Sequence, residues 1–326
     1  MAGKQLSEQQ QRRIAKREQA VIDNYTSGNS NHYHTGRVIG SHGHNVIIEI
    51  DTQQTLPCKW HRDRSRPVCG DQILWLYEDE RNGMIEAVLP RSSLLERPDS
   101  RGHLRPVAAN IDRLGIVIAN SPPFNEGLLD RYLVAASIIN VTPLIIVNKT
   151  DLLDAEAHAS IKQRLDVYVQ LGYEILFTSA KQIHGLDALQ QALREHTVIF
   201  VGQSGVGKSS LINGLLPEAG AEIGDISTAT GKGRHTTTTA SLYHLPCGGK
   251  LIDSPGVREF GLTHAEPAEV EQAYPEILEA AQHCRFNDCR HTNEPGCAVR
   301  TAIAQGEIDE GRFARYQAIL NSLAEE

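Results

Sequence analysis

The sequence predicts a multidomain protein with an N-terminal β-barrel, a central α/β domain of the P-loop class and a C-terminal helical domain that binds a metal ion. Three patterns predict this fold class. Short strand-like runs fill residues 34–106, strands and helices alternate over 107–259, and Cys and His residues gather within the helical, acidic segment 260–326. A polar segment, 1–33, precedes them. The chain length of 326 residues suits two or three domains of roughly 100–200 residues each.

The composition excludes several classes of protein. Hydrophobic residues make up 40% and charged residues 22% of the chain, as in an ordinary globular protein. No apolar run approaches the length of a transmembrane helix, and the N-terminus lacks the apolar core of a secretory signal. We therefore expect a cytoplasmic monomer with no membrane partner, in which the six cysteines are thiols or metal ligands. The net charge of −8 restricts any nucleic-acid contact to local basic surfaces.

The N-terminal segment 1–33 carries five basic and three acidic side chains and few apolar ones. This predicts a flexible basic arm, mobile or partly helical, which either contacts RNA phosphates or is a solvated tail.

Residues 34–106 predict a small closed barrel such as an OB-fold. The expected strands are 36–39, 45–50, 71–77 and 83–89. Basic residues gather in the predicted loops beside Trp60 and His61: Lys59, Arg62, Arg64, Arg66, Arg91, Arg97, Arg101 and Arg105. Aromatic and basic side chains together favour RNA binding, whereas the acids of the same span leave a solvated barrel face as the alternative.

Segment 107–259 predicts a mostly parallel sheet covered by helices. The expected strands are 114–118, 143–147, 174–177, 198–201 and 250–252, and the expected helices are 127–139, 155–171, 186–196 and 208–215. A phosphate-binding loop follows the fourth strand and matches G-x-x-x-x-G-K-[ST]. Its residues are Gly202, Gln203, Ser204, Gly205, Val206, Gly207, Lys208 and Ser209. Backbone N–H groups would surround the β-phosphate, Lys208 would reach the β- and γ-phosphates, and Ser209 would bind Mg²⁺.

Two further motifs indicate guanine as the base. Asn148, Lys149, Thr150 and Asp151 form an N-K-x-D turn after a strand. The carboxylate of such a turn accepts from N1–H and the exocyclic amine of guanine, a pair that adenine lacks. Ser179 and Ala180, also after a strand, would supply backbone donors to the guanine O6.

The magnesium and switch residues follow the phosphate loop. Asp253 begins a D-x-x-G element and would bind Mg²⁺, while the N–H of Gly256 would sense the γ-phosphate. Thr237, in the Gly- and Thr-rich segment 228–239, is the predicted switch ligand to Mg²⁺, with Thr236 and Thr238 as neighbouring candidates.

The residue after Gly256 is Val257, which cannot orient water, so intrinsic hydrolysis should be slow. We expect the catalytic residues to be Lys208, Asp253 and His235. In this hypothesis His235 orients the water; Arg234 is a rival, and His235 as an exposed or rRNA-contacting residue is the alternative.

The order of the motifs is permuted. In an ordinary GTPase the phosphate loop, switch threonine and D-x-x-G come first, whereas here the N-K-x-D and S-A-K elements precede them. The D-x-x-G element therefore leads directly into segment 260–326, so loss of the γ-phosphate can act on the C-terminal domain.

Cys284, Cys289, His291 and Cys297 supply three thiolates and one imidazole. This set fits a closed, tetrahedral structural Zn²⁺ site, although the thiolate-rich chemistry leaves iron open.

Over about residues 34–326 the chain resembles the bacterial RsgA (YjeQ) family of ribosome small-subunit-dependent GTPases. The resemblance rests on the permuted motifs, GQSGVGKSS, the G-K-G-R-H-T-T-T loop, DSPGVREFGL and C-x₄-C-x-H-x₅-C. It implies GTP binding by 148–151 and by 202–210, which adds Ser210, one Zn²⁺, and Mg²⁺ with GTP. It also implies late maturation of the 30S subunit, contacts with 16S rRNA, and hydrolysis of GTP to GDP stimulated by that subunit.

Two alternatives come from other classes of protein. One is a metabolic P-loop nucleotide kinase, against which the guanine turn and the lack of an obvious second-substrate lid speak. The other is an RNA-binding module with a vestigial GTPase, against which intact Lys208, Ser209 and Asp253 speak.

Overall fold

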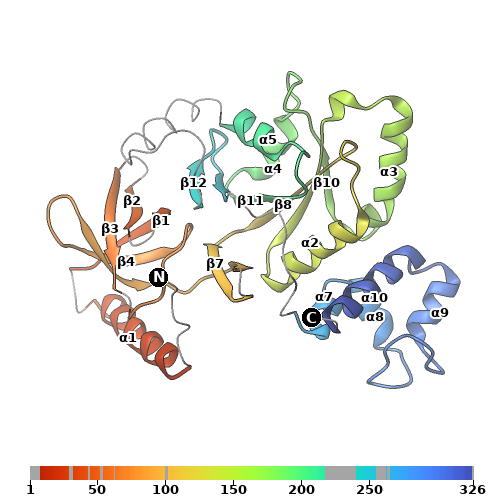
Figure 1. Cartoon of the computed structure of the whole chain (residues 1–326), viewed down its shortest axis with the longest axis horizontal. Helices are drawn as coiled ribbons and strands as arrows, with labels where there is room; N and C mark the ends of the chain where they lie inside the picture. Colours follow the sequence, from red (N-terminus) through yellow and green to blue (C-terminus); the bar gives the residue numbers. More distant parts are fainter. Residues whose placement is uncertain are drawn as a thin grey trace. The chain divides into compact units, whose positions relative to one another are not determined.

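The structure is a computed structural model that forms two compact units (Figure 1). It describes residues 8–28, 32–42, 45–51, 54–61, 63–99, 102–216, 240–254, 262 and 265–324. The first unit takes its described residues from 1–111, 195–199 and 224–256, and the second from 112–194, 200–223 and 257–326. Among the described helices, none combines the length and the apolarity needed to cross a bilayer.

The N-terminal barrel in the first unit has five strands. These are β1 (His34–His42), β2 (Asn45–Asp51), β3 (Gln54–Trp60), β4 (Gln72–Tyr77) and β5 (Gly83–Val88). They follow the order β1-β2-β3-β5-β4, and β4 pairs back onto β1, so the barrel closes. β3 and β5 run parallel and the other neighbours antiparallel, which is the predicted OB-type arrangement. Val38, Ile48, Ile73 and the fully buried Trp75 fill the interior.

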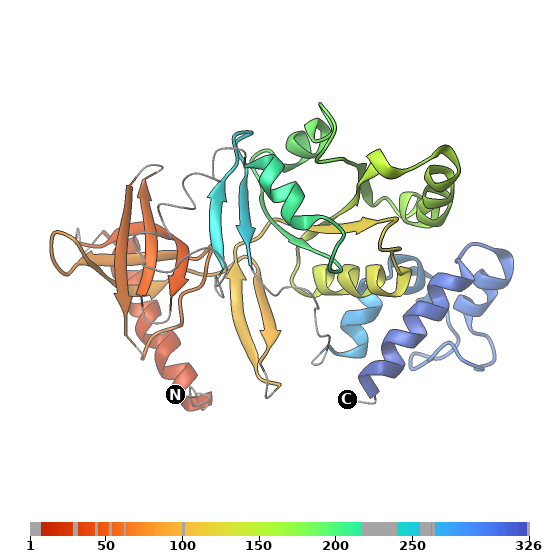
Figure 2. The same cartoon turned by 45° about the horizontal axis from the view of Figure 1, so that its top comes forward.

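Helix α1 (Glu8–Thr26) lies against β5 of this barrel (Figure 2). Ile14 and Glu18, one turn apart on the same helix face, are both buried. The Glu18 carboxylate accepts hydrogen bonds from the backbone N–H of Ser65 at 3.1 Å and its hydroxyl at 2.6 Å. Residues 8–26 therefore form a docked helix, within the segment 1–33 that the sequence predicted as a mobile or partly helical arm.

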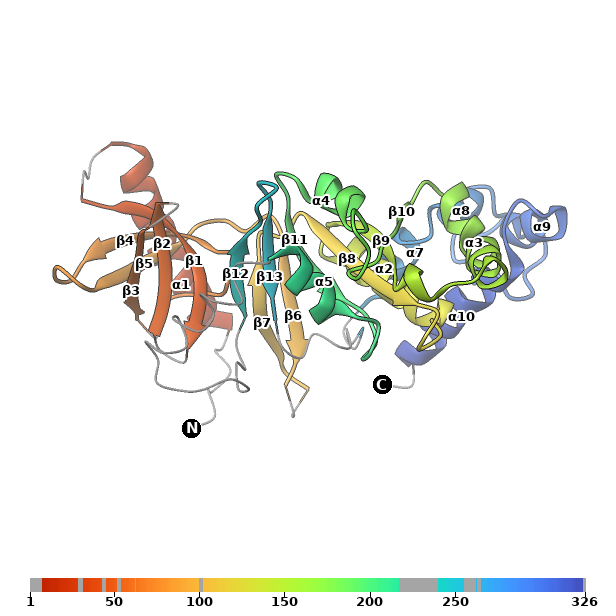
Figure 3. The ribbon, with the colours of Figure 1, turned by 90° about the horizontal axis from the view of Figure 1, so that it is seen from above.

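The first unit also contains a hairpin and three strands that continue the barrel sheet (Figure 3). The hairpin is β6 (Leu94–Pro98) and β7 (Leu104–Ala109); the strands are β12 (Ser241–His244), β13 (Lys250–Asp253) and the start of β11 (Thr197–Val201). β12 is antiparallel to both β13 and β1, and β11 is parallel to β13. The order is thus β11-β13-β12-β1, and β13 carries Asp253 at its carboxyl end.

The second unit holds three parallel strands in the order β10-β9-β8. They are β8 (Arg113–Ala119), β9 (Thr142–Asn148) and β10 (Glu174–Phe177), with helices α2 (Glu126–Ile138), α3 (Ala155–Gln170), α4 (Asp187–Leu193) and α5 (Lys208–Leu215) and the 3₁₀ turn η1 (Thr150–Leu152). The end of β11 lies against β8: a Cβ on Gly115 would sit 2.5 Å from the ring of Phe200. The strands are apolar on both faces, as expected of parallel strands covered by helices.

The C-terminal helices of this unit share an apolar core with α2 (Figure 2). They are α7 (Pro267–Gln272), α8 (Pro275–Ala281), α9 (Ala298–Gln305) and α10 (Glu310–Ala324). Of these helices, α7 and α10 pack directly against α2. Val134 of α2 shares one apolar cluster with Val270 of α7, Ile277 of α8 and Val299 of α9. This shared core joins the C-terminal helices to the α/β part of the unit.

A buried ionic cluster lies between α2 and the C-terminal helices. Asp130 of α2, which is fully buried, accepts hydrogen bonds from Arg312 at 2.8 Å, Arg315 at 2.7 Å and the hydroxyl of Tyr168 at 2.7 Å. Arg312 also pairs with Glu276 of α8. Burial, reinforced by the Asp130 carboxylate, raises the pKa of Tyr168, which keeps this hydroxyl a donor. The cluster pairs charged groups that would otherwise be buried without a partner of opposite charge.

We predict that Arg312→Leu destabilises the second unit by about 3–5 kcal/mol, because it leaves Glu276 without its cation and the buried Asp130 with Arg315 alone. Urea unfolding followed by far-ultraviolet circular dichroism measures the free energy of unfolding. Arg81→Leu, at an exposed position in the first unit, is the control and should shift stability by less than about 0.5 kcal/mol. Equal stability of the two variants would contradict the importance of the cluster.

Candidate nucleotide site and metal centre

The phosphate loop follows β11 and ends at the N-terminus of α5, as predicted. Gly202, Gly205 and Gly207 all have positive φ angles, of 137°, 84° and 96°. A Cβ on Gly202 would lie 2.2 Å from the carbonyl oxygen of Val117, and one on Gly207 would lie 2.4 Å from Nδ2 of Asn148. Glycine is thus required here by both conformation and close packing. The loop presents the start of a helix, where backbone N–H groups favour an anion.

Lys208, the first residue of α5, lies over this loop. Its ammonium donates to the carbonyl oxygens of Gly202 at 2.6 Å and Gln203 at 2.7 Å. Ser209 and Ser210 follow it and are exposed. A cation and a hydroxyl at the N-terminus of one helix form a set that can bind a phosphate chain and an oxygen-preferring metal ion.

The predicted base-reading turn contacts the phosphate loop directly. Asn148, at the end of β9 and only 2% exposed, donates from Nδ2 to the carbonyl oxygen of Val206 at 2.9 Å. Lys149 has a φ of 64° and donates from Nζ to the carbonyl oxygens of Gly205 at 2.6 Å and Ser121 at 2.8 Å. The turn and the loop are therefore held together through side-chain hydrogen bonds.

The segment after β10 completes the arrangement. The hydroxyl of Ser179, fully buried, donates to Oδ1 of Asp151 at 2.6 Å, and the N–H and hydroxyl of Thr150 both donate to the carbonyl of Thr178. Ala180 is half-buried beside Ser179. Asp151 is thus oriented by a neighbouring loop and keeps Oδ2 for another donor.

The other predicted site residues lie either in the first unit or outside the described residues. Asp253 ends β13 in the first unit, and burial raises the pKa of its carboxyl group, as expected for a desolvated carboxylate. Gly256, Thr237 and His235 lie outside the described residues, and so do Arg234, Thr236 and Thr238. The second unit therefore brings together the residues of 148–151, 179–180 and 202–210.

Two functional contacts were not predicted from the sequence. The carbonyl oxygen of Ser121, after β8, accepts a hydrogen bond from Lys149. The carbonyl oxygen of Gly185 accepts one from the backbone N–H of Ser179 at 3.1 Å and so closes the loop between these two residues. A backbone acceptor leaves no mark in the sequence, whereas a glycine in a short loop is a weak signal.

The predicted metal ligands converge in the C-terminal helices. Sγ of Cys284 lies 3.6 Å from Nδ1 of His291 and 3.9 Å from Sγ of Cys297, and the four ligand atoms, including Cys289, all lie within 4.8 Å of one another. Tetrahedral Zn²⁺ bonds of about 2.3 Å to sulfur and about 2.0 Å to nitrogen imply separations of about 3.5–3.8 Å. The residues therefore fit a four-coordinate metal ion.

A carboxylate backs the histidine of this cluster. Nε2 of His291 faces Oε1 of Glu271 on α7 at 3.7 Å, while Nδ1 faces the thiols. Metal-binding histidines commonly direct their other nitrogen to such a carboxylate. The motif did not indicate Glu271, which lies well before it in the sequence.

Comparisons with known proteins agree on one family. The sequence model described as RsgA GTPase matches residues 88–263. The Small ribosomal subunit biogenesis GTPase RsgA of Azotobacter vinelandii is 46% identical over 324 residues, which cover 98% of this chain and 94% of that protein. The crystal structure of YjeQ from Thermotoga maritima superposes with a TM-score of 0.75 at 29% identity, covering 90% of this chain and 99% of that one. YloQ, described as a circularly permuted GTPase, gives a TM-score of 0.73 at 27% identity, covering 90% and 96%.

We predict that Asp151→Asn weakens GTP binding about 100-fold, because an amide cannot accept from both N1–H and the exocyclic amine of guanine. The same amide can donate to the C2 carbonyl of xanthine, so binding of xanthosine triphosphate should improve. Titration of each nucleotide against the variant measures the change in the two dissociation constants. Asp166→Asn, on the exposed face of α3, is the matched control and should bind GTP normally. Unchanged preference for GTP in Asp151→Asn would contradict the base-reading role.

Proposed function

The chain belongs to the RsgA GTPase family and is therefore a GTP hydrolase, and from this premise we propose that it acts in biogenesis of the small ribosomal subunit. In this proposal it binds the immature 30S subunit with GTP and leaves after hydrolysis to GDP. The observation that carries the proposal is the hydrogen-bonded assembly of the N-K-x-D turn on the phosphate loop through Asn148. That assembly is built to hold one guanine nucleotide, and it does not favour the kinase alternative.

The proposed nucleotide contacts follow from the site. Asp151 accepts from the Watson–Crick edge of guanine, oriented by Ser179. Lys149 lies along the base while its ammonium fastens the two loops. The N–H groups of 202–207 and the helix start at Lys208 surround the phosphates. Because these groups are fixed before the nucleotide arrives, little ordering is required on binding.

Magnesium is the metal that such a site takes with GTP. The donors that the sequence motifs offer are oxygens, the exposed hydroxyl of Ser209 in the second unit and the half-buried carboxylate of Asp253 in the first, and Mg²⁺ prefers oxygen ligands. When bound, Mg²⁺ neutralises charge on the β- and γ-phosphates. Thr237 completes the proposed ligand set from the sequence, and Gly256 is the proposed γ-phosphate sensor.

His235 is the proposed water-orienting residue, since Val257 stands where Ras-type enzymes place a glutamine. Contact of the 234–235 segment with the ribosome would supply this histidine to the reaction. Basal turnover is then slow, and the subunit acts as activator.

The barrel supports a contact with 16S rRNA at selected residues. Tyr77 is 55% exposed and stands edge-on to His34, with ring centroids 5.3 Å apart, so both rings can stack on bases. Trp60 instead packs partly against the barrel interior. We propose a cytoplasmic monomer whose barrel faces the rRNA, in keeping with the local basic surfaces expected from its acidic total charge.

Zinc is the proposed occupant of the Cys284–Cys297 cluster. Three thiolates and an imidazole form a closed set with no position for substrate, which suits a structural role. The ligands hold α9 to the segment before it, since Cys297 is the N-cap of that helix.

We predict that 30S subunits raise GTP turnover by at least tenfold, whereas 50S subunits leave it at the basal rate. Under 30S stimulation, His235→Ala should lower turnover about 100-fold, because a positioned base or water-orienting group typically contributes that much. His158→Ala, on α3, controls for loss of an imidazole and should be stimulated normally. Stimulation by 50S subunits, or by neither, would contradict the proposed partner, and full stimulation of His235→Ala would contradict the role of that residue.

We predict one zinc ion per chain by elemental analysis of the purified protein. Cys297→Ser should lose it and lower the thermal midpoint, because zinc binding contributes folding free energy directly. Cys247→Ser removes a thiol outside the cluster and is the control, with zinc retained. Iron in place of zinc, or equal zinc in both variants, would contradict the proposal.

A further inference from the structure

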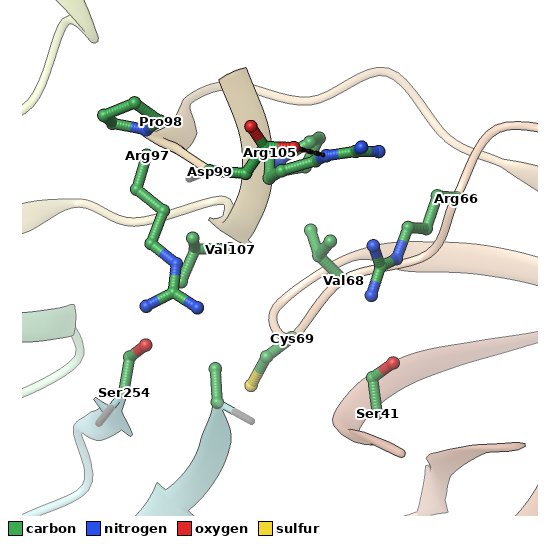
Figure 4. Close-up of a pocket in the computed structure, with 12 residues that line it drawn as sticks. Ser41, Arg66, Val68, Cys69, Arg97, Pro98, Asp99, Arg105, Val107 and Ser254 are labelled. Carbon is green, nitrogen blue, oxygen red and sulfur yellow. Dashed lines mark hydrogen bonds and ion pairs between the residues drawn. The ribbon is translucent and has the colours of Figure 1, made fainter. Parts of the chain in front are cut away.

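A cavity of about 450 Å³ opens within the first unit (Figure 4). None of its lining residues belongs to 148–151, 179–180 or 202–210, whereas Ser254 directly follows Asp253. Its lining comes from β1, the segment before β4, both strands of the β6–β7 hairpin and the ends of β12 and β13. The lining residues are Ser41, Arg66, Val68, Cys69, Arg97, Pro98, Asp99, Arg105, Pro106, Val107, Ala240 and Ser254. Its volume lies in the range of small-molecule sites.

Three arginines give this cavity its charge. Arg97 and Arg66 extend their guanidinium groups into it from different sides, and Arg105 stands on the hairpin between them (Figure 4). Arg105 pairs with Asp99 at 3.0 Å, the one carboxylate in the lining. Three cations against one anion leave an excess of two positive charges.

Arg66 and Arg97 differ from three other basic residues of the barrel, whose charges are paired. Lys59 pairs with Glu78, Arg64 with Glu86 and Arg91 with the buried Asp71. Across the described part of the chain, no carboxylate forms an ion pair with Arg66 or Arg97 through their side chains. Two exposed guanidinium groups therefore line the cavity, and none of the described carboxylates neutralises them.

The remaining walls suit a small phosphorylated molecule. Ser41 and Ser254 contribute hydroxyls on the side facing the arginines, and Val68, Pro98 and Val107 contribute apolar surface (Figure 4). The thiol of Cys69 also lines the cavity, and its burial raises its pKa, so it remains an unreactive thiol.

We propose that this cavity binds the terminal phosphate group of a small phosphate monoester, through residues other than those proposed to hold GTP. A monoester phosphate carries close to two negative charges and three acceptor oxygens, which match the excess charge and the forked donors of the arginines. A phosphodiester of an RNA backbone carries one charge and two free oxygens, so it matches less well. The apolar walls would contact the organic part of the ligand.

The test is calorimetric titration of the full-length chain saturated with GDP and Mg²⁺, which keeps phosphate probes out of the nucleotide site. The probes are inorganic phosphate, adenosine 5′-monophosphate and a short single-stranded RNA with hydroxyl ends. We expect saturable binding of the first two. Arg66→Gln and Arg97→Gln should each raise the dissociation constant about tenfold.

Arg81→Gln, at an exposed arginine outside the cavity, is the matched control and should bind as the unaltered chain does. Unchanged GTP turnover in all three variants shows that they are folded, and it separates this proposal from the proposed function. Absence of saturable phosphate binding, or equal binding by Arg66→Gln and Arg97→Gln, overturns the proposal. Binding of the hydroxyl-ended RNA at the same arginines, without binding of the monoester, also overturns it and assigns the cavity to a nucleic-acid backbone.

Discussion

The amide of Asn148 joins the two loops on which the nucleotide site depends. Its hydrogen bond to the carbonyl of Val206 is buried, and Gly207 must lack a side chain for the amide to fit. A buried amide that loses its acceptor costs roughly 1–3 kcal/mol, so the turn and the phosphate loop stay in register. Lys149 adds a second connection through Gly205. The groups predicted to read the base and those predicted to hold the phosphates are thus one rigid arrangement.

This arrangement is continuous with the C-terminal helices. Lys149 donates a hydrogen bond to the carbonyl oxygen of Ser121, and α2 begins a few residues later with an N-cap at Asn125. Farther along α2, Asp130 receives Arg312 and Arg315 of α10. The segment 260–326 was predicted as a separate domain, yet within its unit it shares a core with α2. Because α7 and α10 pack directly on α2, a displacement of these helices would change the contacts of α2.

The sequence predicted best the elements whose residues carry their own pattern. β10 and α5 have the predicted bounds, because a buried parallel strand reads as an apolar run and the glycine-rich loop marks the helix start. β3 was missed because its outward positions hold Thr55, Pro57 and Lys59. The β6–β7 hairpin was taken for loops because Arg and Pro interrupt it. α1 was predicted only as part of a mobile or partly helical arm, and its docking was not predicted, because the buried contacts described above come from just two side chains, Ile14 and Glu18.

Charge shows the limit of sequence reasoning most clearly. The basic residues of the barrel looked equivalent in the sequence, but Arg91 is neutralised by a buried aspartate twenty positions away in the chain and Arg64 by Glu86 on a neighbouring strand. Such pairs depend on how β4 and β5 are placed, so no local pattern indicates them. The acidic total charge likewise counts carboxylates that are already paired. A ligand meets only the charge that such pairing leaves, and two of the arginines without an ion pair, Arg66 and Arg97, line the same cavity.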